Sequence, residues 1–319
     1  MSSVTGSHTR TKDGQVILLN APAYSMDDVE NIAASAADGI GLLSTDFMYL
    51  NRDNLPEEEE QLEILLRVSR LMGNRPVTVR TLQAHPKTIR AIDSSELSNN
   101  CRGVRLGLAR PDILQTQLRA IVRASSEGNF RLLLPMVADV TEVIKVKDTI
   151  NTMHRELCEQ NTHSLPDLGI ELEVPGALVM APVLAFEVSF FSISERLKQH
   201  TLLAADVNCR NNDLLHDYAP SFLFQISALA EEVRKRRKSV AVTAPLAWQP
   251  PAIPLLIAMG VNELVMPPEH IEQARRIIAR LTMPKAKLVT SKAMSFWFPD
   301  EIQRYAEECL SRLAPGAGC

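Results

Sequence analysis

Two kinds of hydrophobic pattern alternate along this chain. Short, nearly continuous apolar runs typical of buried strands are separated by longer segments whose apolar residues recur every three or four positions, as in amphipathic helices. Strands are predicted at 16–19, 39–43, 76–82, 130–136, 170–174, 190–194, 240–243 and 263–266. Helices are predicted at 25–37, from 56–60 onward, 111–125, 141–159, 183–186, 221–235, 252–259 and 271–281. Strands that alternate with helices favour a parallel sheet covered by helices. About eight such units, without a GxGxxG fingerprint, predict an α/β fold of the closed (β/α)8 TIM barrel type rather than an open doubly wound sheet.

Other segments add less regular elements. Two more short strands are predicted, one that holds Arg102 and Arg105 and one at 200–205, and residues 83–100 form a long polar excursion from the scaffold. The expected organisation is a flexible N-terminal tail at 1–12, a barrel at 13–282 and a C-terminal helical extension at 283–319. That extension ends in a helix at 300–313 and is expected to pack on the barrel or on a second subunit.

Composition changes this picture little. A hydrophobic fraction of 45%, a charged fraction of 23% and a net charge of −4 are ordinary for a globular protein, and they give no bulk electrostatic reason to expect nucleic acid. The basic run at 234–238 is interpreted as a solvated helix end. No apolar run approaches the roughly 18 residues that span a bilayer, and the N-terminus lacks a signal core, so a cytoplasmic protein with no membrane contact is expected. The five cysteines, without CxxC spacing, predict reduced thiols.

Charged side chains stand near the predicted carboxyl ends of several strands. In a (β/α)8 barrel such residues face one mouth, which would gather Arg80, Arg131 and Glu173, with Arg102 from the adjoining segment. Guanidinium groups around a carboxylate suit a small polyanion held with a divalent metal. The alternative is that each arginine only forms an ion pair with a neighbouring acid.

Six motifs along the chain occur in the order and spacing of a known family. They are GIGLLSTDFMYLNRDNLPEEEEQ (39–61), PVTVRTL (76–82), ILQTQLRAIVRAS with FRLLLPM (113–136), IELEVPGAL (170–178), FFSIS (190–194) and AIPLLIAMGVNELVMPP (252–268). Over roughly residues 10 to 285 the chain resembles the C-terminal, phosphoenolpyruvate-binding barrel of Enzyme I of the bacterial phosphotransferase system. Pyruvate phosphate dikinase and phosphoenolpyruvate synthase share that barrel.

The resemblance implies roles for four retained residues. Arg80, Arg102 and Arg131 match arginines that grip phosphoenolpyruvate, and Glu173 matches a glutamate that holds magnesium. The family's mechanism transfers the phosphoryl group to a histidine on a separate swivelling domain, after which a cysteine protonates the enolate. The resemblance also implies a homodimer, for which the aromatic cluster 296–298 offers an apolar surface.

At other positions the chain departs from the family pattern. Ser44 stands where an arginine is expected, Val207 replaces another arginine, and Thr243 occupies the position of the proton-donating cysteine. The second metal ligand, an aspartate, is missing, and Glu195 is the nearest carboxylate that could substitute. The loop after Arg80 has lost both family glycines. A threonine hydroxyl is a poor acid or base unless a neighbour activates it, so the proton step is expected to be disabled.

The function expected from these features is a degenerate Enzyme I barrel that binds phosphoenolpyruvate, or a similar small phosphorylated or carboxylic acid, with weak affinity for Mg²⁺. Neither the carrier-binding domain nor the phosphohistidine domain is recognised in this sequence, so phosphoryl transfer by the chain alone is not expected. Two alternatives stay open. One is a metal-dependent lyase or aldolase on the same barrel, and the other is a non-catalytic dimerisation or regulatory module, including a decoy for authentic Enzyme I subunits.

Overall fold

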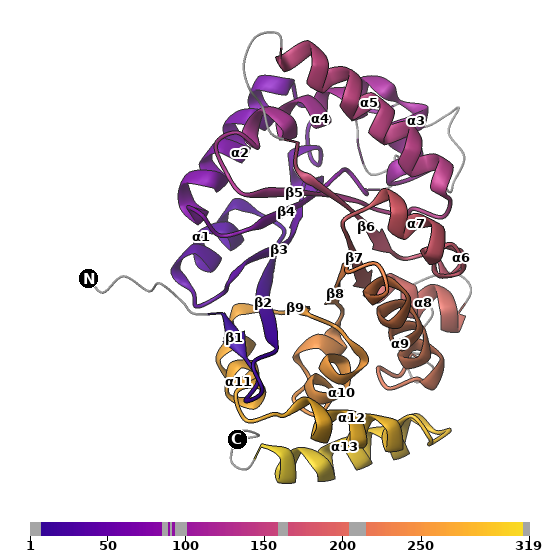
Figure 1. The fold of residues 1–319 in the computed structure, drawn as a ribbon. Coiled ribbons are helices and arrows are strands. Elements are labelled where there is room, and N and C mark those ends of the chain that lie inside the picture. Colours follow the sequence, from indigo (N-terminus) through magenta and orange to yellow (C-terminus); the bar gives the residue numbers. More distant parts are fainter. Residues whose placement is uncertain are drawn as a thin grey trace.

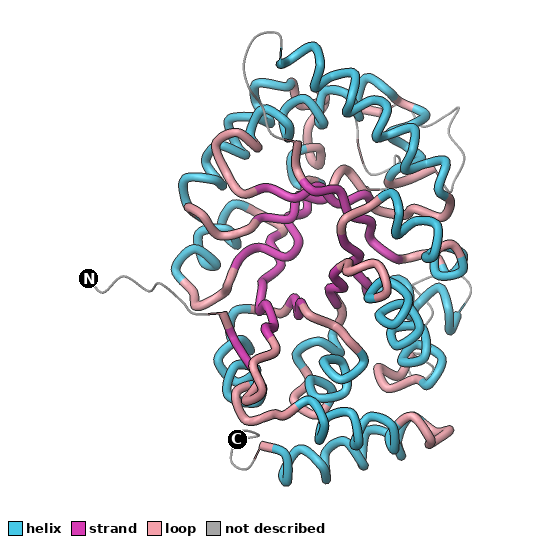
Figure 2. Tube along the Cα trace, viewed as in Figure 1, coloured by secondary structure: helices cyan, strands magenta, loops and turns pink. Residues whose placement is uncertain are grey.

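Eight parallel strands form a closed barrel. The structure, a computed structural model, describes residues 8–84, 89, 91–92, 101–158, 165–203 and 215–314. Strands β2 to β9 are paired in sequence order and β2 also pairs with β9, which closes the ring visible in Figure 2. The strands are β2 (Val16–Ala23), β3 (Gly39–Ser44), β4 (Val77–Arg80), β5 (Phe130–Leu134), β6 (Asp167–Leu172), β7 (Phe190–Ser194), β8 (Ser239–Thr243) and β9 (Glu263–Val265). The (β/α)8 barrel predicted from the hydrophobic pattern is confirmed.

Helices surround the ring of strands on the outside (Figure 1). They are α1 (Met26–Ala34), α2 (Glu58–Met72), α3 (Val104–Ala109), α4 (Pro111–Ala124), α5 (Val140–Cys158), α6 (Pro175–Val179), α7 (Ala181–Glu187), α8 (Glu195–Leu203), α9 (Pro220–Arg234), α10 (Ala252–Met259) and α11 (Pro268–Ile278). Two of these helices begin at residues that favour a helix start. Ser25 caps α1, because its hydroxyl accepts the Asp28 amide at 3.2 Å, and Pro111 occupies the first turn of α4.

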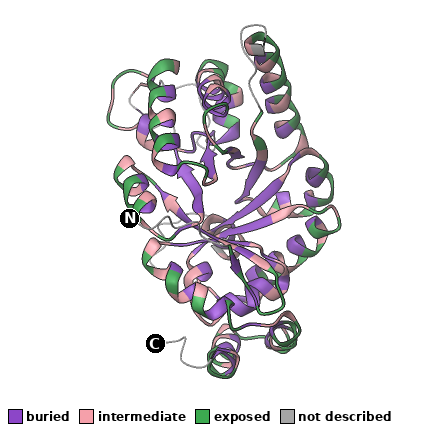
Figure 3. Ribbon diagram, turned by 60° about the vertical axis from the view of Figure 1, so that its left-hand side comes forward, coloured by how far each residue is buried: buried purple, intermediate pink, exposed green. Residues whose placement is uncertain are grey.

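The main apolar core lies between the strands and the helices. Successive side chains of a strand point to opposite faces, so Ile170 and Leu172 of β6 enter this outer core while Gly169 and Glu171 face the barrel axis. Figure 3 shows the strands and the inward faces of the helices as buried, with exposed residues on the outer helix surfaces. A much smaller apolar cluster of Leu42, Leu133 and Phe190 is separate from the outer core. The interior of the barrel therefore has room for many polar side chains.

Both ends of the described chain add to the barrel. The short strand β1 (Thr9–Arg10) pairs antiparallel with the start of β2, so part of the expected tail at 1–12 forms structure, and residues 1–7 lie outside the described residues. Helix α12 (Met283–Ala293) packs against α10, and α13 (Pro299–Leu313) packs against α12. The two helices lie side by side at the lower edge of Figure 1.

Two predicted strands are wrong. Residues 200–203 belong to helix α8, in which the Thr201 hydroxyl donates to the Leu197 carbonyl at 2.7 Å and Lys198 pairs with Glu195 one turn away. Arg102 lies outside regular secondary structure. Arg105 lies in α3, which begins directly after Gly103, a glycine whose backbone φ is +58°. The barrel closes without these segments, because every inner edge already has a partner strand. Residues 204–205, and 85–88, 90 and 93–100 of the polar excursion, lie outside the described residues.

Candidate functional site

A cavity of about 430 Å³ opens where the carboxyl ends of the strands meet. This is the end at which (β/α)8 enzymes place their active sites. Its lining combines acidic, basic and hydroxyl side chains with a few apolar ones. The lining residues are Tyr24, Leu42, Ser44, Asp46, Phe47, Leu50, Arg80, Gln83, Glu171, Glu173, Ser194, Glu195, Arg196 and Thr243.

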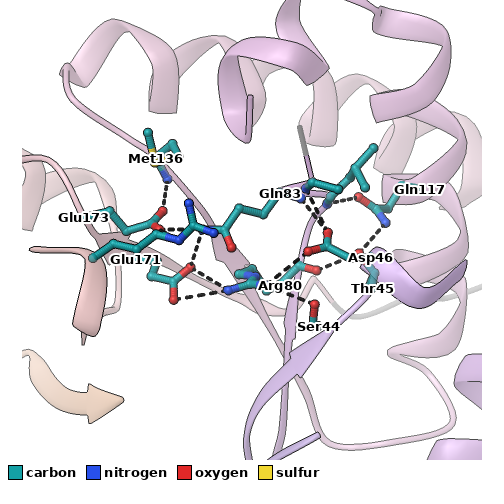
Figure 4. Close-up of polar contacts among 12 residues, drawn as sticks. Ser44, Thr45, Asp46, Arg80, Gln83, Gln117, Met136, Glu171 and Glu173 are labelled. Carbon is teal, nitrogen blue, oxygen red and sulfur yellow. Dashed lines mark hydrogen bonds and ion pairs between the residues drawn. The ribbon is translucent and has the colours of Figure 1, made fainter. Parts of the chain in front are cut away.

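Arg80 is the central cation of this cavity. It is the last residue of β4, and its side chain is only 8% exposed. One guanidinium nitrogen, Nη1, donates to Glu171 Oε2 at 3.2 Å and Oε1 at 3.4 Å. The other, Nη2, donates to Ser44 Oγ at 3.0 Å and Asp46 Oδ2 at 3.5 Å (Figure 4). Burial disfavours the charged guanidinium, but Glu171 and then Asp46 outweigh that effect and raise the pKa of Arg80.

Glu173 follows β6 and is fully buried beside Glu171. Its Oε1 accepts from Gln83 Nε2 at 2.5 Å, its Oε2 accepts from the Met136 amide at 2.7 Å, and Arg196 Nε lies 3.4 Å from Oε1. Burial and then the negative charge of Glu171 raise the pKa of Glu173 to about 8. Gln83 also donates to Glu171 Oε2 at 3.4 Å, so it bridges the two carboxyl groups. The pair therefore holds a proton at neutral pH.

Backbone and side-chain contacts fix the loop after β4. Asp46 Oδ1 accepts the amides of Gln83 and Ala84 at 2.8 and 3.1 Å. The Thr45 hydroxyl donates to the Arg80 carbonyl at 2.9 Å and accepts from Gln117 Nε2 at 3.0 Å. These buried and half-buried contacts, drawn in Figure 4 for Thr45, Asp46, Gln83 and Gln117, hold Arg80 and Gln83 in place.

Thr243 ends β8 at the rim of the same cavity. Its hydroxyl lies 3.1 Å from the Ser192 hydroxyl, which is its only hydrogen-bonding partner in the described part of the chain. Neither hydroxyl is acidic or basic enough to activate the other near neutral pH.

Comparison with known proteins identifies the family. The family model for the PEP-binding domain of the PEP-utilising enzymes matches residues 2–283. The chain belongs to this family. The relatives include phosphoenolpyruvate-protein phosphotransferases of Listeria monocytogenes and Bacillus subtilis, each 32% identical over 307 residues, and of Staphylococcus aureus, 34% identical over 310 residues. These matches cover 94%, 94% and 95% of this chain and 54% of each relative, so the chain spans about half the length of the relatives. The resemblance inferred from the sequence motifs is confirmed.

One solved structure supports the fold alone. A citrate lyase from Burkholderia xenovorans LB400 superimposes with a TM-score of 0.53 at 15% identity, over 95% of both chains. No helix within the described ranges is long and apolar enough to cross a membrane.

Arg131 is not at the mouth of the barrel, contrary to the sequence prediction. It is the second residue of β5 and is in register with Thr78, two residues before Arg80 on the neighbouring strand. Its Nη2 donates to both oxygens of Glu263 at 2.9 and 3.0 Å, its Nε donates to Thr78 Oγ1 at 3.0 Å, and its guanidinium covers the Phe190 ring. The alternative interpretation, an arginine paired with a neighbouring acid, applies here. Arg131 closes the amino-terminal end of the barrel interior.

Arg102 lies near the site but outside the cavity lining. Burial and then the charge of Arg196 lower its pKa, and Glu173 acts in the opposite direction. The three side chains are therefore close enough for their charges to interact. Val207, which replaces a family arginine, lies outside the described residues.

Glu173 and Glu195 both line the cavity, as expected for candidate metal ligands. Glu195 Oε1 pairs with Lys198 at 2.8 Å, while its Oε2 is buried and has no hydrogen-bond partner among the described residues. Burial raises the pKa of Glu195, against the effect of Lys198. No group of three or more histidine, cysteine or acidic side chains that could hold a metal ion occurs in the described ranges.

Sequence reasoning missed several residues of the site. Asp46 begins a short 3-10 turn after β3, Gln83 lies on the loop after β4, and Arg196 lies in the first turn of α8, where no element was predicted. His200 Nδ1 lies 2.6 Å from the Glu173 carbonyl oxygen. Only Glu171 carried a usable signal, since a residue two positions from Glu173 on a strand shares its face.

Proposed function

We propose that this chain binds phosphoenolpyruvate or a similar small acid in the mouth cavity and does not complete phosphoryl transfer by itself. The observation that carries the proposal is the position of Arg80, Arg196 and Glu173 on one cavity of about 430 Å³, next to a Thr243 hydroxyl that has no activating partner among the described residues. A guanidinium can anchor a carboxylate or phosphate, whereas the unactivated hydroxyl cannot protonate an enolate.

Mg²⁺ is proposed as a weakly held companion of that ligand. It would be held by Glu173 and by the free Oε2 of Glu195, with the remaining ligands supplied by water and by the bound acid. Bound metal would add positive charge that draws an acidic ligand to the cavity. Because Glu173 is held protonated by burial, metal binding must displace that proton, which weakens the affinity.

Titration calorimetry with Mg²⁺ and phosphoenolpyruvate tests the binding part of the proposal. Saturable binding is expected, and it is expected to disappear in Arg196→Met, which removes the more exposed of the two cations that line the cavity. If the folded chain shows no heat with phosphoenolpyruvate or with pyruvate, the mouth is not a ligand site.

The catalytic part is tested by exchange of labelled pyruvate into phosphoenolpyruvate, with a phosphohistidine domain of a relative supplied as a separate protein. We expect no exchange above the protein-free control, because the proton donor is missing. Thr243→Cys alone is expected not to restore exchange, since the metal site would still be incomplete. The phosphoenolpyruvate-protein phosphotransferase of Bacillus subtilis serves as the positive control. Clear exchange by the unmodified chain would contradict the proposal.

We also propose a homodimer, supported by an exposed apolar surface on the C-terminal extension. Leu288, Trp297 and Phe298 are 74%, 77% and 66% exposed. Such large exposed apolar side chains are typical of interfaces when they lie together. In sedimentation velocity at micromolar concentration we expect a dimer, and a monomer for the double variant Trp297→Ser/Phe298→Ser. Phe186→Ser, at an exposed aromatic on α7, is the matched control and should stay dimeric. A monomeric unmodified chain would refute the proposal.

A further inference from the structure

The mouth cavity carries more acidic than basic side chains. Of its described lining residues, four are acidic (Asp46, Glu171, Glu173 and Glu195) and two are basic (Arg80 and Arg196). Arg80 already has two acidic partners within the chain, Glu171 and Asp46. Arg196 lies 3.4 Å from Glu173, whose carboxyl group is held protonated, so Arg196 is the cation of this lining that an entering anion can use.

Glu171 is the principal partner of Arg80, and it is held in place. Its side chain is 2% exposed, both of its oxygens accept from Arg80 Nη1, and Gln83 donates to Oε2 at 3.4 Å. The other terminal guanidinium nitrogen, Nη2, donates to Ser44 and Asp46. Figure 4 shows these groups converging on the guanidinium from both sides. The position that an external carboxylate or phosphate would use on Arg80 is thus occupied by a carboxylate of the chain.

The charge of the ligand decides how much the acidic side chains of the cavity weaken its binding. A phosphate ester carries about −1.5 to −2 near neutral pH, so a phosphorylated carboxylic acid brings close to three negative charges. A simple 2-oxo acid such as pyruvate brings one. At partly buried sites the repulsion between like charges is several times stronger than in bulk water, so the triply charged ligand is disfavoured more.

We propose that Glu171 is an internal counter-ion that occupies the anion-binding groups of Arg80 and makes the cavity select small monocarboxylates, of the 2-oxo acid class, over phosphorylated acids. This inference rests on the proposed ligand function of the same cavity and names its ligand class. Glu171 is then a specificity-determining residue, and its removal should release Arg80 for an external phosphate.

The test is titration calorimetry of phosphoenolpyruvate and pyruvate, with Mg²⁺ present, against the unmodified chain and Glu171→Gln. The unmodified chain is expected to bind pyruvate at least as tightly as phosphoenolpyruvate. In Glu171→Gln the ratio of phosphoenolpyruvate affinity to pyruvate affinity should rise at least about tenfold. Glu187→Gln removes an equal charge from the outer surface, where Glu187 pairs with Lys147, and should leave the ratio unchanged.

A second variant covers the case in which Glu171→Gln does not fold. Asp46→Asn neutralises the more distant acid on Arg80, at 3.5 Å, and should shift the ratio in the same direction by about threefold. A preference of the unmodified chain for phosphoenolpyruvate, or an unchanged ratio in a folded variant, would overturn the inference. If the unmodified chain binds neither acid but Glu171→Gln binds phosphoenolpyruvate, the proposed function fails and the role of Glu171 stands. No binding by any of these proteins rejects both.

Discussion

Arg80→Met is expected to destabilise the protein by about 3–5 kcal/mol, the typical cost of removing one partner from a buried ion pair. Arg80 neutralises Glu171 and Asp46 inside the barrel, and both Glu171 and Glu173 are almost inaccessible to water. Without the guanidinium, buried carboxylates stand close together with no cation between them. Urea unfolding followed by circular dichroism at pH 7 would measure the loss.

The cause of that loss can be separated from the loss of packing. In the double variant Arg80→Met/Glu171→Gln the uncompensated carboxylate is gone, so we expect most of the stability to return. Arg67→Met is the control, because Arg67 and Glu30 form an exposed pair, 56% and 48% accessible, whose removal costs about 0–1 kcal/mol. A double variant as unstable as Arg80→Met would show that the charge argument is wrong.

Glu173→Gln is expected to change how stability depends on pH. The pKa of Glu173 is raised by burial and by Glu171 to about 8 in the folded protein, against 4.5 for the free side chain, so the folded state binds the proton more tightly. Below pH 4.5 the group is protonated in both states and has no effect. Between pH 4.5 and 8 the unfolded state ionises while the folded state does not, so the unmodified chain loses up to about 1.4 kcal/mol per pH unit. Glu173→Gln lacks this loss.

The measurement is the free energy of unfolding in urea at pH 5, 6, 7 and 8. Glutamine has one acceptor oxygen where Glu173 accepts from both Gln83 and Met136, so a constant cost of about 1 kcal/mol is expected at every pH. In addition to this constant cost, the free energy of unfolding of Glu173→Gln should increase relative to that of the unmodified chain as the pH rises. Glu60→Gln is the control. Arg52 lowers the pKa of Glu60, so this exposed group is ionised in both states from about pH 6 upward, and its removal should give almost no slope there. Parallel curves for Glu173→Gln and the unmodified chain would contradict the raised pKa.

The local pattern of the chain was enough for the architecture. Each barrel strand has apolar residues that must be buried on its outer face. Each helix between the strands has apolar residues along one side, and these cover that face, as α4 does for β5. Such patterns depend only on neighbours a few residues apart, so they can be read directly. The strand prediction is wrong over 200–203 because the few apolar residues there fit a short strand as well as a helix, and the contacts of the helix α8, which starts at Glu195, favour the helix.

The sequence by itself determined the closed barrel, the family and the placement of Arg80 and Glu173 at strand ends, because these follow from periodicity and from motifs of adjacent residues. The tertiary structure decided which charges meet. Arg80 and Glu171 are 91 positions apart, and Arg131 and Glu263 are 132 apart, so strand register alone sets these pairs. Two residues along a strand correspond to about 7 Å, which is enough to separate a residue at the mouth from one in the barrel interior. Arg131 lies two residues before the position level with Arg80, so it meets Glu263 and does not reach the cavity.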